Sequence, residues 1–402
     1  MAKHLCARDT CKKAALEGGK YCGRACREKA YRLRKKLKGP SPVSLAAERK
    51  IEEQRRELAF ELYGNAADFL KDVKPLAPLP KQLFATQLAD MGFDSPIEAV
   101  IPFHDLHFGS KIDPRVNGGF AFYNPDLARE RLTRWRDLVL RFTQQWQLTT
   151  TVDEANVLAL GDDFEGHGKM FGTQAFSIAE SIGFQYLGFV DDVSQVLLDM
   201  LSRYKKIRVF KVHGNHGRVT ASAKDAYPPD NFELMAWQNI ADRVRASCGG
   251  EWQETTPGGV RSMTGGLIDF NIASSPRMLL KIVEHKFLVT HGHGMKGIQN
   301  TYTGAMATKL AWNSVIGETI DWLVKAHLHE AQQAESEIGG GIIQGGCFVG
   351  PSDYSISMRS PAASLPSQEL FFMHPKHGKV HHETLHLASV AEMRQFQEWI
   401  GN

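Results

Sequence analysis

The chain has 402 residues, 43% of them hydrophobic and 23% charged, which is the balance of an ordinary globular protein. This length allows two domains, or one large domain and an appendage. No apolar run approaches the roughly 18 residues that cross a bilayer, so a membrane protein is not expected. The basic N-terminus has no apolar segment behind it, so we expect no secretory signal and a cytoplasmic location.

Basic charge is concentrated at the N-terminus. Residues 1–40 contain 13 lysines and arginines and three acids, a net charge of +10, whereas the other 362 residues hold 35 bases and 42 acids, a net charge of −7. A basic arm of this kind predicts a polyanionic partner.

Four of the six cysteines lie in the first 26 residues, in two short pairs separated by ten residues. In a cytosolic protein such a cluster favours a metal site over disulfides. Four thiolates at this spacing can close a tetrahedral structural Zn²⁺ site, which a segment too short for its own core needs. The alternative is unrelated reduced thiols. The segment resembles the end of small bacterial zinc-ribbon-like modules, and its predicted zinc ligands are Cys6, Cys11, Cys22 and Cys26.

A basic helix is predicted after these cysteines. Ala30, Leu33 and Leu37 recur at helical spacing, and the other faces are basic. A helix with this charge density would bind phosphate backbones without reading sequence, and DNA is favoured over RNA. The alternatives are a solvated face or a protein-docking surface. The predicted nucleic-acid-binding residues are Arg27, Lys29, Arg32, Arg34, Lys35, Lys36 and Lys38.

Residues 1–38 are therefore predicted to form a zinc-binding module, and 39–95 a helical and proline-rich linker. Within the linker, 44–71 has the pattern of charged amphipathic helices that could form a homodimer interface or pack on the main domain. The main domain is predicted to span 96–392.

From residue 96 onward, predicted strands alternate with predicted helices. A capped amphipathic helix is expected at 124–146 and helical material at 174–204. The alternation predicts an α/β sheet covered on both faces, in which ligands gather at the carboxyl ends of the strands. The strands are expected at 97–105, 155–163, 206–216, 286–294 and 320–329.

Histidines, aspartates and an asparagine gather where these strands end. Eight of the 16 histidines fall in four of five clusters, which are HDLH (104–107), GDDFE (161–165), HGNH (213–216), HGH (291–293) and HLH (327–329). One such histidine is ordinary in a loop. Five clusters at successive strand ends predict a shared cation, because buried imidazoles and carboxylates without partners are costly.

The ligand types narrow the choice of metal. Imidazole nitrogen and carboxylate oxygen together suit Mn, Fe, Zn, Co or Ni, and Mn²⁺ is favoured. One metal would leave several of the groups unused. Two divalent metal ions sharing a bridging carboxylate would use nearly all of them and would activate water for in-line attack on phosphorus.

The motif set resembles the calcineurin-like metallophosphoesterase superfamily, in its nuclease-type branch, whose pattern is DxH, GD, GNH, an isolated His and GHxH at strand ends. The resemblance covers roughly 96–350 and implies an α/β fold, a sandwich of two mixed β-sheets flanked by helices. The matching residues are Asp105 and His107, Gly161 and Asp162, Gly214 to His216, His291, and Ala326 to His329.

The resemblance also implies roles for these residues. The first metal would take Asp105, His107, Asp162 and His329, and the second Asn215, His291 and His327, with Asp162 bridging both. His216 would be the acid that assists departure of the leaving oxygen, and an imidazole can titrate near neutral pH.

The sequence departs from the family pattern after His216, where the family often has an acid and this chain has Gly217 and Arg218. Arg218 is predicted either to contact a non-bridging phosphate oxygen in the catalytic site or to be a simple surface arginine. Ala326 replaces the usual glycine, which matters only if its φ is positive.

Other polar groups accompany the predicted ligands. Asp163 and Glu165 either support the ligands or are merely solvated, and His104, His213 and His293 either support them or are neighbours by chance. The histidines of 373–387 suit a β-hairpin with exposed imidazoles better than a third metal site.

The leading hypothesis is a dimetal phosphodiesterase acting on nucleic acid, a nuclease whose N-terminal module serves as a tether. One alternative is a phosphoesterase for small cyclic or dinucleotides or for phosphoproteins, because the fold does not choose a substrate. Another is a nucleic-acid-binding scaffold with a vestigial site.

Overall fold

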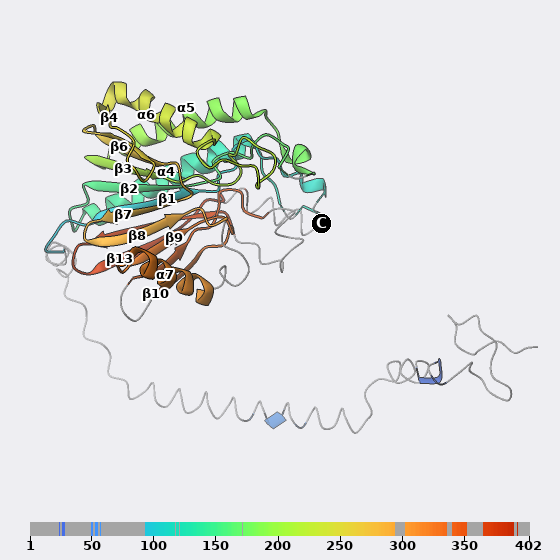
Figure 1. Ribbon diagram of the computed structural model, residues 1–402. Helices are drawn as coiled ribbons and strands as arrows, with labels where there is room; N and C mark the ends of the chain where they lie inside the picture. The colour runs from blue at the N-terminus through green and yellow to red at the C-terminus, as the bar shows by residue number, and fades with distance from the viewer. Residues whose placement is uncertain are drawn as a thin grey trace, which may run out of the picture. The chain divides into compact units, whose positions relative to one another are not determined.

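The computed structural model describes most of the chain from residue 93 onward and a few residues before it (Figure 1). The chain divides into two compact units, Met1–Lys81 and Gln82–Asn402. The described residues are 24, 26–28, 50, 53–54, 57, 93–116, 118–119, 121–170, 172–293, 302–335, 340–351, 365–389 and 392. In the first unit the described residues are helical, and Arg24 pairs with Glu28 one turn later at 3.4 Å.

The larger sheet of the second unit has eight strands and is mixed. Its four central strands β1, β2, β3 and β6 run parallel, and antiparallel strands extend it at both edges. In spatial order the strands are β13 (Gly378–His386), β12 (Ser367–His374), β1 (Glu98–His104), β2 (Glu154–Gly161), β3 (Lys206–Lys211), β6 (Ile268–Ala273), β5 (Val260–Thr264) and β4 (Glu251–Trp252).

The smaller sheet has five strands and is also mixed, with β8, β9 and β11 parallel at its centre. In spatial order its strands are β10 (Gln332–Glu335), β11 (Gly341–Gln344), β9 (Trp322–Lys325), β8 (His285–Thr290) and β7 (Arg277–Ile282).

In the part of the chain that the structure describes, the helices cover the outer face of each sheet (Figure 1). Three long helices lie against the larger sheet: α4 (Pro125–Gln147), α5 (Ile182–Met200) and α6 (Phe232–Cys248). Helix α7 (Tyr302–Ile316) lies against the smaller one. Two short 3-10 helices, η1 (Pro114–Val116) and η2 (Gln174–Ser177), lie in the loops. The prediction of a sandwich of two mixed sheets flanked by helices is therefore confirmed.

The alternation of side chains along the strands explains this layering. In β1, Ala99, Ile101 and Phe103 join the core under α4 to α6, whereas Val100 points to the core between the sheets. In β8, Phe287 and Val289 lie in that second core and Leu288 faces α7. The expectation of a single sheet covered on both faces needs one correction. The inner face of each sheet is covered by the other sheet, because its second set of apolar residues packs there.

Local sequence signals predict where the long helices begin. Asn124 caps α4, since its Oδ1 accepts a hydrogen bond from the Leu127 N–H at 2.8 Å, and Pro125 occupies the first turn. The predicted helical stretch at 174–204 divides into η2 and α5, which begins after Ser181. Within the described part of the chain, no helix has both the length and the apolarity that a bilayer crossing requires.

The histidine-rich segment near the C-terminus forms a β-hairpin, as predicted, from strands β12 and β13. The prediction that its imidazoles are exposed is wrong for His381 and His382, which are half-buried, and for His374, which is fully buried. Its Nδ1 accepts hydrogen bonds from the backbone N–H groups of Lys376 and His377, each at 3.1 Å, so this imidazole closes the hairpin turn.

Candidate metal centre

The five predicted clusters follow the carboxyl ends of β1, β2, β3, β8 and β9, and the structure brings them together. These ends come from both sheets, so the sandwich closes the site from two sides. Sequence reasoning located each cluster within a few residues of the strand that carries it.

Backbone strain is concentrated at the same residues. Six non-glycine residues of the described chain have a positive φ, and the single one away from the site is Val283. The other five are Asp105 (52°), His107 (46°), Asp162 (53°), His327 (77°) and His329 (58°). Each such conformation costs on the order of 1–3 kcal/mol and persists only where the surroundings impose it, which is typical of functional sites. Ala326 is not among them, so its replacement of glycine carries no backbone penalty.

The first group of converging atoms comes from Asp105, His107 and His329. The Nε2 atom of His329 lies 3.4 Å from Asp105 Oδ1 and 3.3 Å from His107 Nε2. Asp105 uses its other oxygen, Oδ2, to accept from the His327 N–H at 3.0 Å and to contact His104 Nδ1 at 3.0 Å. Its Oδ1 is buried without a hydrogen-bond partner in the described structure, so it is available to a cation.

The second group comes from Asp162, His291 and His327, with Asn215 beside it. His291 Nε2 lies 3.0 Å from Asp162 Oδ2 and 3.2 Å from Asn215 Oδ1. Asp162 Oδ2 is also 3.9 Å from His107 Nε2, so this one oxygen faces both groups. Its Oδ1 is engaged elsewhere, because it accepts from the His216 N–H at 2.8 Å.

The imidazole tautomers show that a cation fits here. His291 Nδ1 lies 3.0 Å from the carbonyl of Leu160, and a carbonyl can only accept, so Nδ1 carries the proton. In the neutral ring, the bare Nε2 lone pair would then face the oxygens of Asp162 and Asn215, which repel it. Only a proton or a metal ion on Nε2 relieves this repulsion. The donor set of imidazole nitrogens, carboxylates and one amide oxygen therefore matches a divalent transition metal.

The charges around the site shift its pKa values in opposite directions. Burial alone would lower the pKa of His291, but Asp162 and Asp105 raise it to about 9. Burial and the neighbouring His291 lower the pKa of His327 to about 4. Burial would raise the pKa of Asp105, yet the adjacent His329 and His104 hold it well below its usual range. The carboxylates are thus held ionised, as ligands must be.

His216 lies beside the first group. Its ring stands edge-on to that of His107, with centroids 4.5 Å apart at 82°. Its Nδ1 donates to the carbonyl of Glu165 at 2.9 Å, which fixes the ring. Burial would lower the pKa of His216, but Asp162 and Glu165 raise it.

Of the residues whose roles were left open, Glu165 contacts a predicted ligand directly. Its Oε2 accepts from His107 Nδ1 at 3.0 Å, and Gln174 Nε2 donates to its backbone carbonyl at 2.7 Å. His104 contacts a predicted ligand, Asp105, as stated above. Asp163 points away from the site, toward Lys211 and Trp237.

His213 and His293 lie beside the second group without bonding to it in the described structure. Their ring centroids are 6.2 Å apart, and His293 lies 5.5 Å from His291. The Nε2 atom of His213 and the Nδ1 atom of His293 are buried without hydrogen-bond partners among the described residues. Burial lowers the pKa of both rings, that of His293 to about 3.

The Arg218 side chain donates hydrogen bonds to backbone carbonyls of its own loop. Its Nη1, Nη2 and Nε groups donate to the backbone carbonyls of Asn215 at 3.0 Å, Ala221 at 3.1 Å and Thr220 at 3.2 Å. A third role for Arg218, besides contacting phosphate or lying on the surface, is therefore to hold the backbone of the predicted ligand Asn215.

Sequence reasoning missed two residues that contact the site. Glu233, on α6, accepts a hydrogen bond from the Asp162 N–H at 3.0 Å. Cys347, which follows β11, lies beside His329, whose pKa burial would lower but Cys347 and Asp105 raise. Neither belongs to a recognisable motif, and a Glu in the first turn of a helix is ordinary. Contacts of this kind became visible only in three dimensions.

The predicted zinc ligands Cys6, Cys11 and Cys22 lie outside the described residues, as do Lys29, Arg32, Arg34, Lys35, Lys36 and Lys38. Cys26 and Arg27 are described as helical, Cys26 half-buried and Arg27 exposed.

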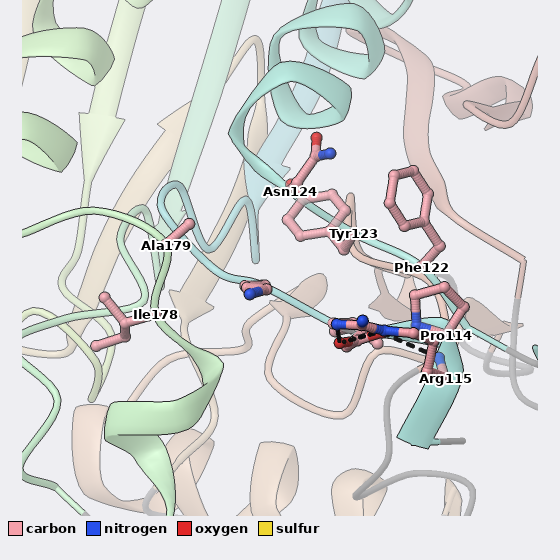
Figure 2. A pocket seen from close by; sticks show the side chains of 10 residues that line it. Pro114, Arg115, Phe122, Tyr123, Asn124, Ile178 and Ala179 are labelled. Atoms are coloured by element: carbon pink, nitrogen blue, oxygen red, sulfur yellow. Dashed lines mark hydrogen bonds and ion pairs between the residues drawn. The ribbon is translucent and has the colours of Figure 1, made fainter. Parts of the chain in front are cut away.

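A pocket of about 460 Å³ lies in the loop that follows β1 (Figure 2). In Figure 2, Ile178 and Ala179 lie on one side, and Phe122 and Pro114 on the other. Tyr123 connects this pocket to the loop that carries the predicted ligands Asp105 and His107, because its hydroxyl donates to the backbone carbonyl of Leu106 at 2.6 Å. Lys111 and the Asp113–Arg115 ion pair supply its charged lining.

No protein-family model matches the sequence, and no curated protein matches it. Solved structures with similarity to this chain include an archaeal phosphodiesterase, at 9% identity and a TM-score of 0.31 over 72% of this chain and 99% of the other. Vacuolar protein sorting 29 from Cryptosporidium parvum is 11% identical, with a TM-score of 0.31 over 72% of this chain and 97% of its own. A hypothetical protein from Pyrococcus horikoshii is 9% identical, with a TM-score of 0.36 over 76% and 92%. TM-scores of this size assign no function, so the site geometry has to supply it.

Proposed function

We propose that this chain is a dimetal phosphodiesterase. The observation that carries the proposal is the position of Asp162 Oδ2, 3.0 Å from His291 Nε2 and 3.9 Å from His107 Nε2. A carboxylate oxygen that faces two separate groups of nitrogen and oxygen ligands is suited to bridge two metal ions. The strained backbone at five of the seven predicted ligands supports a functional role for the same residues.

The two groups of side chains define two ligand sets. The first would be Asp105, His107, Asp162 and His329, and the second Asp162, Asn215, His291 and His327. Two divalent ions, with Mn²⁺ favoured over Fe, Zn, Co or Ni, would supply positive charge for the phosphate and lower the pKa of a water molecule. Asn215 completes the second set without adding negative charge, which leaves the site attractive to a phosphodiester anion.

His216 is the residue proposed to protonate the leaving oxygen. With Nδ1 donating to the Glu165 carbonyl, its second nitrogen, Nε2, is the one that can hold and transfer the catalytic proton. The carboxylates of Asp162 and Glu165 favour the protonated ring, which is the form that a general acid needs. Its N–H bond to Asp162 Oδ1 ties the acid to the proposed bridging ligand.

The proposed substrate is nucleic acid, with DNA favoured over RNA. The support is the net charge of +10 in residues 1–40 and the four cysteines that would hold a structural Zn²⁺ beside a basic helix. This module would act as a tether that raises the local concentration of phosphodiester bonds near the metal centre.

An activity panel tests the proposal. The full-length protein, stripped of metal and reloaded in turn with Mn²⁺, Fe²⁺, Zn²⁺, Co²⁺ and Ni²⁺, is incubated with single-stranded DNA, double-stranded DNA, RNA and bis-p-nitrophenyl phosphate. We expect cleavage of at least one polymer, and loss of that activity in Asn215→Ala and His216→Ala. The control is His386→Ala, which removes an exposed imidazole of the hairpin. Intact substrates with every metal tested would refute the phosphodiesterase.

The tether is tested separately. A full-length variant with Arg34, Lys35 and Lys36 changed to Gln should bind and cut DNA less well and with a shallower salt dependence, whereas its turnover of bis-p-nitrophenyl phosphate should be unchanged. Equal loss on both substrates would argue against a tether, because a tether acts only on a polymer.

A second substrate class is favoured by one observation, the pocket of about 460 Å³ in the loop after β1. This volume suits a small ligand, and Phe122 and Lys111 could contact a base and a phosphate, respectively. A cyclic or dinucleotide is therefore the second candidate. If it is the substrate, Lys111→Ala raises its KM and leaves cleavage of polymers unaffected.

A further inference from the structure

A buried glutamate joins two of the loops that carry the candidate metal ligands. Glu233 lies in the first turn of α6 and is fully buried. Its Oε1 accepts from the Asp162 N–H and its Oε2 from the Gly214 N–H, each at 3.0 Å. These two amides belong to the loops after β2 and β3, so one carboxylate sets the distance between Asp162 and Asn215.

The helix end that carries Glu233 holds the second loop at further points. The Phe232 N–H donates to the Gly217 carbonyl at 2.8 Å, and Asn231 Nδ2 donates to the Gly214 carbonyl at 3.3 Å. A Cβ atom at Gly217 would lie 2.5 Å from Glu233 Cγ and 2.4 Å from Asn231 Oδ1. The space that a side chain at position 217 would fill is therefore occupied by Glu233, and position 217 has to be glycine.

A buried lysine pairs with the Glu233 carboxylate. Lys211 Nζ lies 2.9 Å from Glu233 Oε2 and 2.5 Å from Asp163 Oδ2, and all three side chains are fully buried. Trp237 Nε1 donates to the same Asp163 oxygen at 2.8 Å. An ionised carboxylate accepts on both oxygens at once, which a neutral acid or amide in this place cannot do. Lys211 thus compensates a buried charge that would otherwise be unfavourable.

We propose that Glu233 is a positioning residue of the metal centre, which supplies from α6 the acid that is absent after His216. It acts on the backbone of Asp162 and Gly214 and fixes the bridging carboxylate relative to Asn215. The inference rests on the proposed function, since it assigns Glu233 to the metal site of the phosphodiesterase. Groups that hold metal ligands in place commonly contribute about 10–100-fold to metal affinity.

The test is Glu233→Gln in the full-length protein. Glutamine keeps the shape but has one acceptor oxygen, and its NH₂ group would face a backbone N–H donor. The matched control is Glu369→Gln, which alters another buried glutamate, on β12, paired with His382 and Thr384. Binding of Mn²⁺ is measured by titration calorimetry on metal-stripped protein, and the folded fraction by circular dichroism.

We expect folded Glu233→Gln to bind Mn²⁺ about 10–100-fold more weakly than wild type, and Glu369→Gln to bind like wild type even if its stability falls. Equal affinity of folded Glu233→Gln and wild type would overturn the inference and leave the proposed function intact. Failure of the wild type itself to bind Mn²⁺, Fe²⁺, Zn²⁺, Co²⁺ or Ni²⁺ would overturn the proposed function instead. If Glu233→Gln does not fold, Glu233→Asp gives the same comparison, because it keeps the charge and shortens the reach.

Discussion

The Oε2 atom of Glu165 lies 3.0 Å from the Nδ1 atom of His107, a residue 58 positions earlier in the chain. A carboxylate can only accept, so the His107 proton is held on Nδ1 and the Nε2 lone pair is directed at Asp105 and His329. The other oxygen of Glu165 lies 3.8 Å from His216 Nδ1. One carboxylate therefore orients a proposed metal ligand and stabilises the proposed acid.

Changing Glu165 should weaken metal binding. In Glu165→Ala the His107 ring loses its acceptor, so we expect the affinity for Mn²⁺ to fall about 10–100-fold. Glu165→Gln keeps an acceptor oxygen, so its affinity for Mn²⁺ should fall less. Burial would raise the pKa of Glu165, but His216 and His107 lower it. Both substitutions therefore remove an ionised carboxylate. Titration calorimetry measures the affinities, and equal binding by the alanine variant and wild type would contradict this role.

Glycine at position 214 is required by the close approach of two loops. A Cβ atom there would lie 2.1 Å from Asp162 Oδ1 and 2.3 Å from the Asp162 backbone nitrogen. Gly214→Ala should therefore destabilise the fold by about 1–3 kcal/mol and displace the proposed bridging ligand, which abolishes tight Mn²⁺ binding. Gly172→Ala is the control, since a Cβ atom at that position would meet nothing within 4 Å. Urea unfolding and calorimetry distinguish the two variants.

The strand ends were predictable because local sequence specifies them. An apolar run followed by Asp, His or Asn marks the end of a buried strand, and five such ends appeared in chain order. The long helix α4 was equally predictable, because Asn124, Pro125 and the spacing of its apolar residues are all local signals.

The parts of the fold and of the site that the sequence did not predict depend on contacts between distant segments. Strands β4 and β10 have only two and four residues and are mostly exposed, so their sequences lack a strong period. Glu233 meets Asp162 across 71 positions, and nothing in the sequence of α6 shows which helix face covers the site. Likewise the hydrogen bonds from Arg218 to carbonyls depend on the shape of its loop.

Two substitutions distinguish the possible roles of Arg218, which are to hold its loop or to contact phosphate. If the guanidinium mainly holds the carbonyls of Asn215, Thr220 and Ala221, Arg218→Lys should fail about as badly as Arg218→Ala, because an ammonium lacks the planar fork. If it mainly contacts phosphate, the lysine variant should keep most of the activity and the alanine variant should show a raised KM. We expect the first result, with kcat reduced more than KM is raised. Steady-state kinetics on bis-p-nitrophenyl phosphate measure both parameters.

The buried phenol of Tyr204 should limit stability at alkaline pH. Burial raises its pKa above the unfolded value of about 10, although its hydrogen bond with Thr143 acts in the opposite direction. Because the folded state then keeps a proton that the unfolded state releases, this contribution to stability is complete below about pH 10 and is lost as the pH rises further. In Tyr204→Phe, which removes the titrating group, the free energy of unfolding should fall less steeply above pH 10 than in wild type. Tyr227→Phe, at a phenol that is 69% exposed, should follow the wild-type curve. Urea unfolding between pH 8 and 11 measures these slopes, and parallel curves for Tyr204→Phe and wild type would show that the phenol has no such effect.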